Sequence, residues 1–536
     1  MSTHLNAAKY ADSMLTKIVA QRRLDVEAAQ AQVSADELRA TIVAALPAGD
    51  FEAVLRSAPM SVLAEMKRAS PSKGDIAVGI DAAQQGLTYA VSGACTISVL
   101  TEPTWFKGSL DDMRRVREAL QGAGLSPGTC VLRKDFIVDE YQLLEARAHG
   151  ADTALLIVAI LPEDRLAALM AACRALGMEP LVEVNTESEM EVALRAGAKV
   201  IGVNNRNLHT FEVDMGTTSR LAKMLPPAEG SGAARPLLIA LSGVATRSDV
   251  QGFARDGACA VLVGESLMRA LSPSALLGEL LGTARPRALA KVCGLKTVEA
   301  AAAAAAAGAD LLGLIFAPSK RQVGEDAAAE IVREVRRLRP RPDGWAPPRF
   351  SSAQAEAALT GDEAAAARWL ELWRGLLARS VRTGGPLVVG VFVDASVDEM
   401  NRVAEAVGLD LVQLHGHEGW EVAAQLARPA VRVVHMEPGL TSAQVLGQLR
   451  GGANVAAVLL DSKGGGTGTT FDWAIGTEVH AKVPFILAGG LTPLNVGAAN
   501  AQVAPWCVDV SSGVETDGTK DVAKIEAFVR NAQAVA

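Results

Sequence analysis

Sixteen short apolar runs recur along the 536-residue chain, and stretches with helical periodicity separate them. Runs such as CVLRK at 130–134 and LVVGVFV at 387–393 are apolar over most of their length, as in parallel strands that are buried on both faces. Parallel strands need crossover connections, and the helical stretches provide them. Eight runs fall in each half of the chain, and eight strand–helix units in about 250 residues is the size of a (β/α)8 barrel. We therefore predict an α/β protein with two tandem (β/α)8 TIM barrels.

The remaining segments set the predicted domain organisation. Residues 1–285 are expected to form the first barrel, with 1–60 as an N-terminal helical extension, because apolar residues recur there at helical spacing. Residues 286–536 are expected to form the second barrel. Residues 339–386 are too long for a normal strand–helix connection and open with RPRPDGWAPP, which excludes regular structure. We interpret them as an insertion in the second barrel.

The composition restricts the classes of binding partner and the cellular compartment that we expect. The net charge is −8, which argues against nucleic acid as the main partner, because nucleic-acid-binding proteins normally carry a basic face. A small anionic substrate needs only a few local cations. The six cysteines are scattered without metal-binding spacing, so we expect no metal site. No apolar run approaches the roughly 20 residues that span a bilayer, and the N-terminus lacks the apolar core of a signal peptide. We expect a cytoplasmic protein that contacts no membrane.

Polar residues stand where the apolar runs of the first half end, and in a (β/α)8 barrel these strand ends carry the active site. Glu65 and Lys67 alternate with apolar residues in LAEMKRASPS, so both point to one side. Further candidates at or after later runs are Arg133, Lys134, Glu183, Asn204, Arg206, Ser242, Gly243 and Gly264. The last three follow the seventh and eighth runs, where barrel loops commonly bind phosphate. For any one of these charged residues taken alone, a solvated salt bridge at the strand end is an alternative to a functional role. Six strands that all end in polar residues favour a functional site.

In the second half, Cys293 ends the first run, in AKVCGL, and Asp461 ends the sixth. A thiolate and a carboxylic acid that meet across a barrel form a base–acid pair. Each has a structural alternative, Cys293 as a small buried apolar side chain and Asp461 as a solvated strand end. Arg321, in IFAPSKR, suits a clamp on a carboxylate, with a surface charge as its alternative. The phosphate pattern of the first half is repeated by Gly489, Gly490, Ser511 and Gly513.

Five motifs resemble indole-3-glycerol phosphate synthase in sequence and in order: LAEMKRASPSKG, RKDFIVDEYQ, LVEVN, IGVNNRNL and VGESLMR. The resemblance implies that 1-(2-carboxyphenylamino)-1-deoxyribulose 5-phosphate is closed to indole-3-glycerol phosphate with loss of CO2 and water. It implies Lys134 as the general acid, Glu183 as the general base and Lys67 as the partner of the substrate carboxylate. It implies that Glu65 orients Lys67 and hydrogen-bonds the forming hydroxyl group. The residues implied to hold the site, the substrate or its phosphate are Asn204, Arg206, Ser70, Ser242, Gly243 and Gly264.

One position departs from the synthase pattern. The family usually has a glutamate before the Ser-Gly that follows the seventh strand, and this chain has Leu241 there. The departure removes a polar group from the substrate region. It leaves open an alternative in which the synthase half is impaired and serves as a phosphate-binding scaffold.

The second half resembles phosphoribosylanthranilate isomerase through KVCGL, GLIFAPSKR, VQLHG, GGTGTTFDW, ILAGGL and VDVSSGVE. The resemblance implies an Amadori rearrangement of N-(5-phosphoribosyl)anthranilate, whose product is the substrate implied for the first half. Asp461 would protonate the ring oxygen, Cys293 would remove the proton from the second sugar carbon, and Arg321 would bind the anthranilate carboxylate. His415, in VQLHG, is expected to be a wall residue.

Both resemblances imply proton transfers on reactive sugars, so we expect neither a metal nor an organic cofactor. The expected partners are small anionic sugar phosphates. We expect a monomer, and contacts with other enzymes of tryptophan biosynthesis stay open. A rival pair, the isomerase and cyclase barrels of histidine biosynthesis, usually carries aspartates at the first and fifth strand ends. This chain offers Glu65, Lys67, Glu183 and Cys293 instead.

Overall fold

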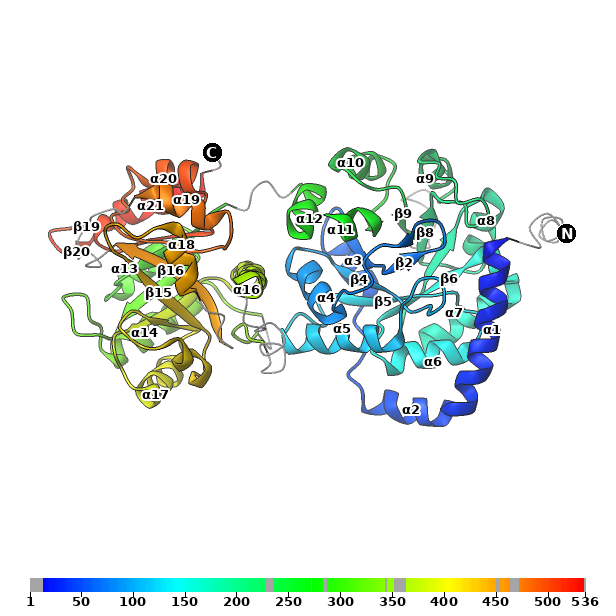
Figure 1. Ribbon diagram of the computed structural model, residues 1–536, viewed down its shortest axis with the longest axis horizontal. Helices are drawn as coiled ribbons and strands as arrows, with labels where there is room; N and C mark the ends of the chain where they lie inside the picture. The colour runs from blue at the N-terminus through cyan, green and yellow to red at the C-terminus, as the bar shows by residue number, and fades with distance from the viewer. Residues whose placement is uncertain are drawn as a thin grey trace. The chain divides into compact units, whose positions relative to one another are not determined.

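The chain divides into two compact units, Met1–Thr283 and Ala284–Ala536, and each contains one closed barrel of eight parallel strands (Figure 1). A computed structural model describes residues 13–226, 235–270, 272–282, 287–342, 345–350, 363–449, 454–462 and 472–534. Helices lie between consecutive strands in both units. The prediction of two tandem TIM barrels is therefore confirmed.

The first barrel closes where its last strand pairs with its first. Its strands are β1 (Ser61–Met66), β4 (Thr96–Leu100), β5 (Cys130–Lys134), β6 (Thr153–Ile157), β7 (Leu181–Val184), β8 (Val200–Asn204), β9 (Leu237–Leu241) and β10 (Ala260–Val263). A small hairpin, β2 (Ala69–Ser70) and β3 (Gly74–Asp75), follows β1. The covering helices are α4 (Ala82–Val91), α5 (Leu110–Gly122), α6 (Glu140–Ala148), η1 (Val158–Ile160), α7 (Glu163–Ala175), α8 (Glu187–Arg195), α9 (Gly216–Ala222), α10 (Arg247–Arg255), α11 (Glu265–Arg269) and α12 (Pro273–Leu281).

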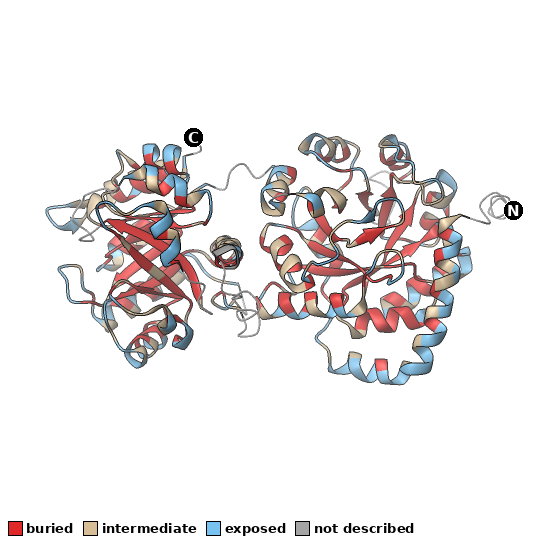
Figure 2. Cartoon of the chain, in the orientation of Figure 1, coloured by how far each residue is buried: buried red, intermediate tan, exposed pale blue. Residues whose placement is uncertain are grey.

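Local sequence explains where many of these helices begin. Ser109, Asp139 and Thr186 precede α5, α6 and α8, and each side chain accepts a hydrogen bond from a backbone N–H of the first turn. The strands between the helices are buried along almost their whole length, as Figure 2 shows. Burial on both faces is the reason why the strands read as unbroken apolar runs.

Three helices precede β1: α1 (Met14–Gln32), α2 (Ala35–Ala44) and α3 (Phe51–Arg56). Leu15 on α1 and Phe51 on α3 are buried in one apolar cluster with the barrel strands. Arg22 on α1 forms an ion pair of 3.0 Å with Asp135, the residue after β5. The N-terminal extension therefore packs onto the barrel and is anchored beside the end of β5.

The second barrel closes in the same way, with its last strand against its first. Its strands are β11 (Leu289–Cys293), β12 (Leu311–Ile315), β13 (Leu387–Phe392), β14 (Leu411–Leu414), β15 (Ala430–Met436), β16 (Val455–Ser462), β17 (Ile486–Leu487) and β18 (Cys507–Val510), and a hairpin, β19 (Glu515–Thr516) and β20 (Thr519–Lys520), follows. The helices are α13 (Val298–Ala306), α14 (Glu325–Leu338), α16 (Glu363–Gly384), α17 (Val397–Val407), η2 (Trp420–Gln425), α18 (Ser442–Gln448), α19 (Trp473–His480), α20 (Val496–Val503), η3 (Ser512–Val514) and α21 (Val522–Gln533). Within the described ranges, no helix is both long and apolar enough to cross a membrane.

Helix α16 lies in the predicted insertion and packs on the N-terminal ends of barrel strands. Trp369 and Trp373 are 1% and 0% exposed, and the two rings meet edge to face. The Trp369 Nε1–H donates to the carbonyl oxygen of Val455, the first residue of β16, at 3.1 Å. Arg341 forms an ion pair with Asp410, just before β14, at 2.7 Å. The described part of the insertion therefore lies at the end of the barrel opposite the strand ends that carry Cys293 and Asp461.

We expect Trp369→Ala to lower the free energy of unfolding of the second unit by about 3–5 kcal/mol, because it empties a buried ring site. Urea denaturation followed by far-ultraviolet circular dichroism measures the loss. Trp369→Phe keeps a ring and loses the hydrogen bond, so it should cost less. Equal losses in the two variants would contradict a packing role for the ring.

Candidate active sites

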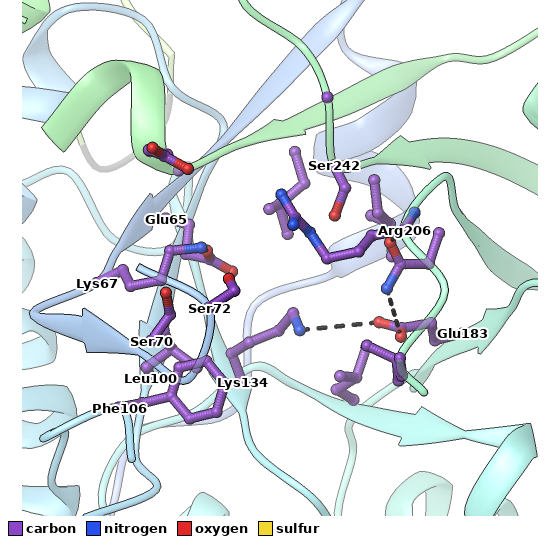
Figure 3. Close-up of a pocket in the computed structure, with 18 of the residues that line it drawn as sticks. Glu65, Lys67, Ser70, Ser72, Leu100, Phe106, Lys134, Glu183, Arg206 and Ser242 are labelled. Carbon is purple, nitrogen blue, oxygen red and sulfur yellow. Dashed lines mark hydrogen bonds and ion pairs between the residues drawn. The ribbon is translucent and has the colours of Figure 1, made fainter. Parts of the chain in front are cut away.

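A cavity of about 390 Å³ opens at the C-terminal strand ends of the first barrel (Figure 3). Its lining includes all but one of the residues that the sequence predicted for this site: Glu65, Lys67, Ser70, Lys134, Glu183, Asn204, Arg206, Ser242, Gly243 and Gly264. The cavity is within the volume range of ligand pockets. The fold thus brings residues from six strands and their loops to one rim.

Glu65 and Lys67 form an ion pair on one wall of this cavity, with 2.7 Å between Oε1 and Nζ. Burial alone would raise the pKa of Glu65, but Lys67 and then Lys134 outweigh it, and the pKa lies below its usual range. Glu65 therefore stays a carboxylate that holds the Lys67 ammonium group. A Cβ atom on Gly264 would come within 2.5 Å of Glu65 Oε1, so the close approach of β10 to this carboxylate requires glycine.

Lys134 and Glu183 face each other across the cavity, with 3.7 Å between Nζ and Oε2 (Figure 3). The Asn204 Nδ2–H donates to the other carboxylate oxygen, Oε1, at 2.8 Å. Oε2 is buried and accepts no hydrogen bond from the described residues. One oxygen of Glu183 is thus fixed, whereas the other is available to a proton in the cavity.

Ser242 and Gly243 form a tight turn after β9. Both have positive φ, 66° and 84°, and a Cβ atom on Gly243 would collide with Met215 Sδ. The Asn205 Nδ2–H donates to the Ser242 carbonyl oxygen at 3.2 Å and holds the turn in place. The backbone of the turn lines the cavity, as a loop that binds phosphate must.

In the second barrel, Cys293 ends β11 and Asp461 lies near the end of β16, and each is 5% exposed. Burial and then the neighbouring Asp509 raise the pKa of Asp461 to about 7. Burial also raises the pKa of Cys293, against the opposing effect of Lys291. Asp461 can therefore hold a proton near neutral pH, as a general acid requires.

His415 stands beside Asp461, with 3.6 Å between Nε2 and Oδ2. Burial, followed by the nearby His435, lowers the pKa of His415 to about 4. The imidazole is therefore neutral at pH 7 and forms part of the wall without adding charge.

Arg321 is already bound to a carboxylate of the protein. Its Nε and Nη2 atoms donate to Oε1 and Oε2 of Glu515 at 2.6 and 3.0 Å. Burial raises the pKa of Glu515, but the hydrogen bonds from Arg321 and Lys520 lower it to about 2. A substrate carboxylate would share this guanidinium group with Glu515 or displace it.

The predicted phosphate residues of the second barrel occupy turns that need glycine. Gly489 and Gly490 have φ of 87° and 64°. A Cβ atom on Gly513 would collide with the carbonyl oxygen of Leu491. The Ser511 hydroxyl donates to the carbonyl oxygen of Cys293 at 3.3 Å and joins this loop to β11. The glycine-rich stretch 464–470 lies outside the described residues.

Comparison with known proteins identifies the family. The model for indole-3-glycerol phosphate synthase matches residues 15–280, and the model for N-(5'phosphoribosyl)anthranilate isomerase matches residues 371–531. A multifunctional tryptophan biosynthesis protein from Phycomyces blakesleeanus is 44% identical over 98% of this chain and 70% of its own length. The chain belongs to the family of multifunctional tryptophan biosynthesis proteins. A tryptophan biosynthesis protein of Phytophthora nicotianae is 42% identical over 97% of this chain and 96% of its own length. The indole-3-glycerol phosphate synthase of Roseiflexus sp. is 45% identical over 51% of this chain and 99% of its own length.

One strand-end candidate of the first barrel lies outside the cavity. Arg133 is 0% exposed and donates to Asp135 and Glu145 behind β5, at 3.0 and 3.1 Å. Successive side chains on a strand point to opposite faces of the sheet. Because Lys134 points into the cavity, the preceding residue, Arg133, points away from it. The expectation that Arg133 joins the site was wrong for this reason.

The cavity also contains residues that the sequence reasoning missed. Among them are Ser72, Phe106, Leu208, Phe211, Ser266 and Arg269. Phe106 lies beside Phe136, with 6.0 Å between ring centroids, and both follow strands of the barrel. The aromatic pair in TEPTWFKG, directly after β4, was the signal that could have identified Phe106 as a wall for an aromatic substrate.

Leu241 is 2% exposed and contributes to the floor of the cavity. A Cβ atom on Gly202 would come within 2.8 Å of Leu241 Cδ1, so the leucine fills the space beside β8. No cluster of three or more His, Cys, Asp or Glu side chains with metal-binding geometry occurs in the part of the chain that the structure describes.

Proposed function

We propose that the chain catalyses two successive steps of tryptophan biosynthesis. The second barrel converts N-(5-phosphoribosyl)anthranilate to 1-(2-carboxyphenylamino)-1-deoxyribulose 5-phosphate, and the first barrel closes this product to indole-3-glycerol phosphate. The family models for the two activities, one on each barrel, support the assignment, and they support it over a phosphate-binding scaffold.

The observation that carries the synthase mechanism is the 3.7 Å gap between Lys134 and Glu183 in the cavity. Lys134 donates a proton to the carbonyl oxygen of the substrate as the aromatic carbon attacks, and CO2 leaves. Lys134, reprotonated from solvent, gives a second proton to the hydroxyl group, which departs as water, and Glu183 accepts the proton that the neighbouring carbon loses as the indole ring becomes aromatic. Lys67, held by Glu65, pairs with the substrate carboxylate until CO2 is lost.

In the isomerase site, Asp461 protonates the ring oxygen of the phosphoribosyl group, and the ring opens to an iminium ion. Cys293 then removes the proton from the second sugar carbon, and the enol formed becomes the ketose product. Arg321 and the turns at Gly489–Gly490 and Ser511–Gly513 hold the carboxylate and phosphate ends. The positions of Cys293 and Asp461 at strand ends and the raised pKa of Asp461 support these roles.

A coupled assay tests the proposal as a whole. The purified chain is supplied with phosphoribosylanthranilate alone, and indole-3-glycerol phosphate is measured over time. We expect both the intermediate and the indole product. Accumulation of the intermediate without indole would remove the synthase assignment, and unchanged phosphoribosylanthranilate would remove the isomerase assignment.

We expect Leu241→Glu to lower kcat/KM of the synthase, because it places a carboxylate in an apolar floor where the native side chain is 2% exposed. Steady-state kinetics of each activity measures the effect, and the isomerase should not change. Leu241→Met is the matched control, because this swap nearly conserves volume. Wild-type kinetics in both variants would show that the site tolerates either residue.

A further inference from the structure

An ion pair lies in the interior of the second barrel, beside the proposed base and acid. The Nζ atom of Lys291 is 3.1 Å from Oδ1 of Asp509, and the Lys291 side chain is 0% exposed. The two residues are register partners on β11 and β18. Replacing such a pair by apolar side chains is often neutral or stabilising, so stability alone gives no reason for two charges here.

Lys291, the cation of this pair, lies on the same strand as the proposed base, Cys293. Lys291 and Cys293 are two residues apart on β11, so their side chains lie on the same face of the strand. Both are buried in the barrel. The Lys291 charge is therefore held close to the Cys293 thiol by the backbone itself.

Asp509, the anion of this pair, lies level with the proposed acid, Asp461. Leu460 on β16 pairs with Leu487 on β17, and Leu487 pairs with Val508 on β18. The next residue on each outer strand is Asp461 and Asp509, so the two carboxyl groups stand at one level with a single strand between them. Residues at one level of adjacent parallel strands point to the same face of the sheet.

The two charges act on the base and the acid in opposite directions. After burial, Lys291 has the largest effect on Cys293 and lowers the pKa of the thiol, against a smaller opposing effect of Asp509. After burial, Asp509 has the largest effect on Asp461 and raises the pKa of the carboxyl group, against a smaller opposing effect of Lys291. The pair as a unit therefore lowers the first pKa and raises the second.

This matters because the reaction needs the thiolate and the protonated carboxyl group together. The pKa of Cys293 is raised from the usual thiol range and that of Asp461 is about 7, so this form is a minority at every pH. Its population falls tenfold for each unit by which the thiol pKa exceeds the carboxyl pKa. Charges that bring the two pKa values closer together therefore increase the fraction of molecules in the active form.

We propose that Lys291 and Asp509 are a positioning pair for the isomerase reaction, which holds Cys293 as its thiolate and Asp461 in its protonated form. The proposal rests on the roles given above to these last two residues. The other charged or titratable groups around them are Lys520, Arg321, Glu515, His415, His435 and Cys507. Lys520 acts on the thiol in the same direction as Lys291, and His415 is neutral at pH 7.

The test is the double variant Lys291→Met/Asp509→Asn in the full chain, which removes both charges and leaves no lone buried charge. Lys482→Met, at an exposed position, is the matched control. The alkylation rate of Cys293 by iodoacetamide is followed against pH by peptide mass spectrometry, alongside kcat and KM of the isomerase against pH. Synthase activity and the melting temperature report whether the chain is folded.

We expect alkylation of Cys293 at pH 7.5 to slow on the order of tenfold, which corresponds to one unit in thiol pKa. The isomerase kcat at its optimum should fall by about ten- to hundredfold with little change in KM. The limb of the pH profile set by the thiol should move to higher pH and the limb set by the carboxyl group to lower pH. A folded double variant with the wild-type thiol titration and both limbs unmoved would overturn the proposal.

Two further variants separate a positioning role from a structural one. Lys291→Arg keeps the charge and should retain the wild-type thiol titration, whereas a loss as large as that of the double variant would overturn the proposal. If the double variant does not fold, the single variant Asp509→Asn serves as the test. It should still move the limb of the pH profile that Asp461 sets to lower pH. An unmoved limb would refute the assignment of Asp509.

Failure of the proposed roles is distinguishable from failure of this inference. Isomerase activity in Cys293→Ala would remove the thiol from the mechanism. The thiol titration of the double variant does not depend on turnover, so it still tests whether the pair sets the ionisation of Cys293.

Discussion

Replacing Lys134 by methionine should abolish formation of indole-3-glycerol phosphate while isomerisation of phosphoribosylanthranilate continues at the wild-type rate. Lys134 reaches into the cavity opposite the unbonded oxygen of Glu183, and methionine fills a similar volume without a proton to give. Loss of a general acid costs about 10²- to 10⁴-fold in turnover. The measurement supplies the ribulose phosphate intermediate directly and follows indole formation.

The matched control for this variant is Lys223→Met, at an exposed position after α9. It should leave both activities unchanged. Loss of both activities in Lys134→Met would contradict the independence of the two barrels, and a synthase rate within a factor of a few of wild type would exclude Lys134 as the acid.

Asp461→Asn should produce the reverse result, with the isomerase reduced by about 10²- to 10⁴-fold and the synthase intact. The amide keeps the shape of the side chain but cannot give a proton to the ring oxygen. The decay of phosphoribosylanthranilate fluorescence measures the isomerase, and indole formation from the supplied intermediate measures the synthase.

The pH dependence gives a second readout of the same residue. Only the protonated form of Asp461 acts as the acid, and its pKa is raised to about 7. Because the pKa of the Cys293 thiol lies above that of Asp461, the wild-type isomerase rate should rise with pH up to about 7 and level off there, and Asp461→Asn should lack this break. Asp398→Asn, at an exposed position on α17, is the control. An unchanged decay rate in Asp461→Asn would remove Asp461 from the mechanism.

The strands and most of the first site could be predicted from the sequence because their signals are local. A strand buried on both faces is an apolar run, and the residue that ends it lies at the catalytic rim whatever the rest of the chain does. Lys134 and Glu183 were found in this way. Arg133 was misplaced because a run that ends in two polar residues does not say which one faces inward.

The pairings between distant residues could not be predicted. Arg321 and Glu515 are 194 residues apart, and Lys291 and Asp509 are 218 apart, so nothing near either member indicates its partner. The apolar face of α16 was visible in its tryptophan spacing, but the strand against which it packs was not. Such contacts depend on barrel closure, which is a property of the whole fold.

The tryptophan contacts of α16 have a consequence for how the protein is made. Trp369 reaches its hydrogen-bond partner across 86 residues of later sequence. At synthesis rates of about 5–20 residues per second, Trp369 is synthesised roughly 4–17 s before that partner. Until the sixth strand of the second barrel is made, the two indole rings lack their packing partner. The nascent chain therefore presents an apolar, aggregation-prone segment to which a chaperone can bind.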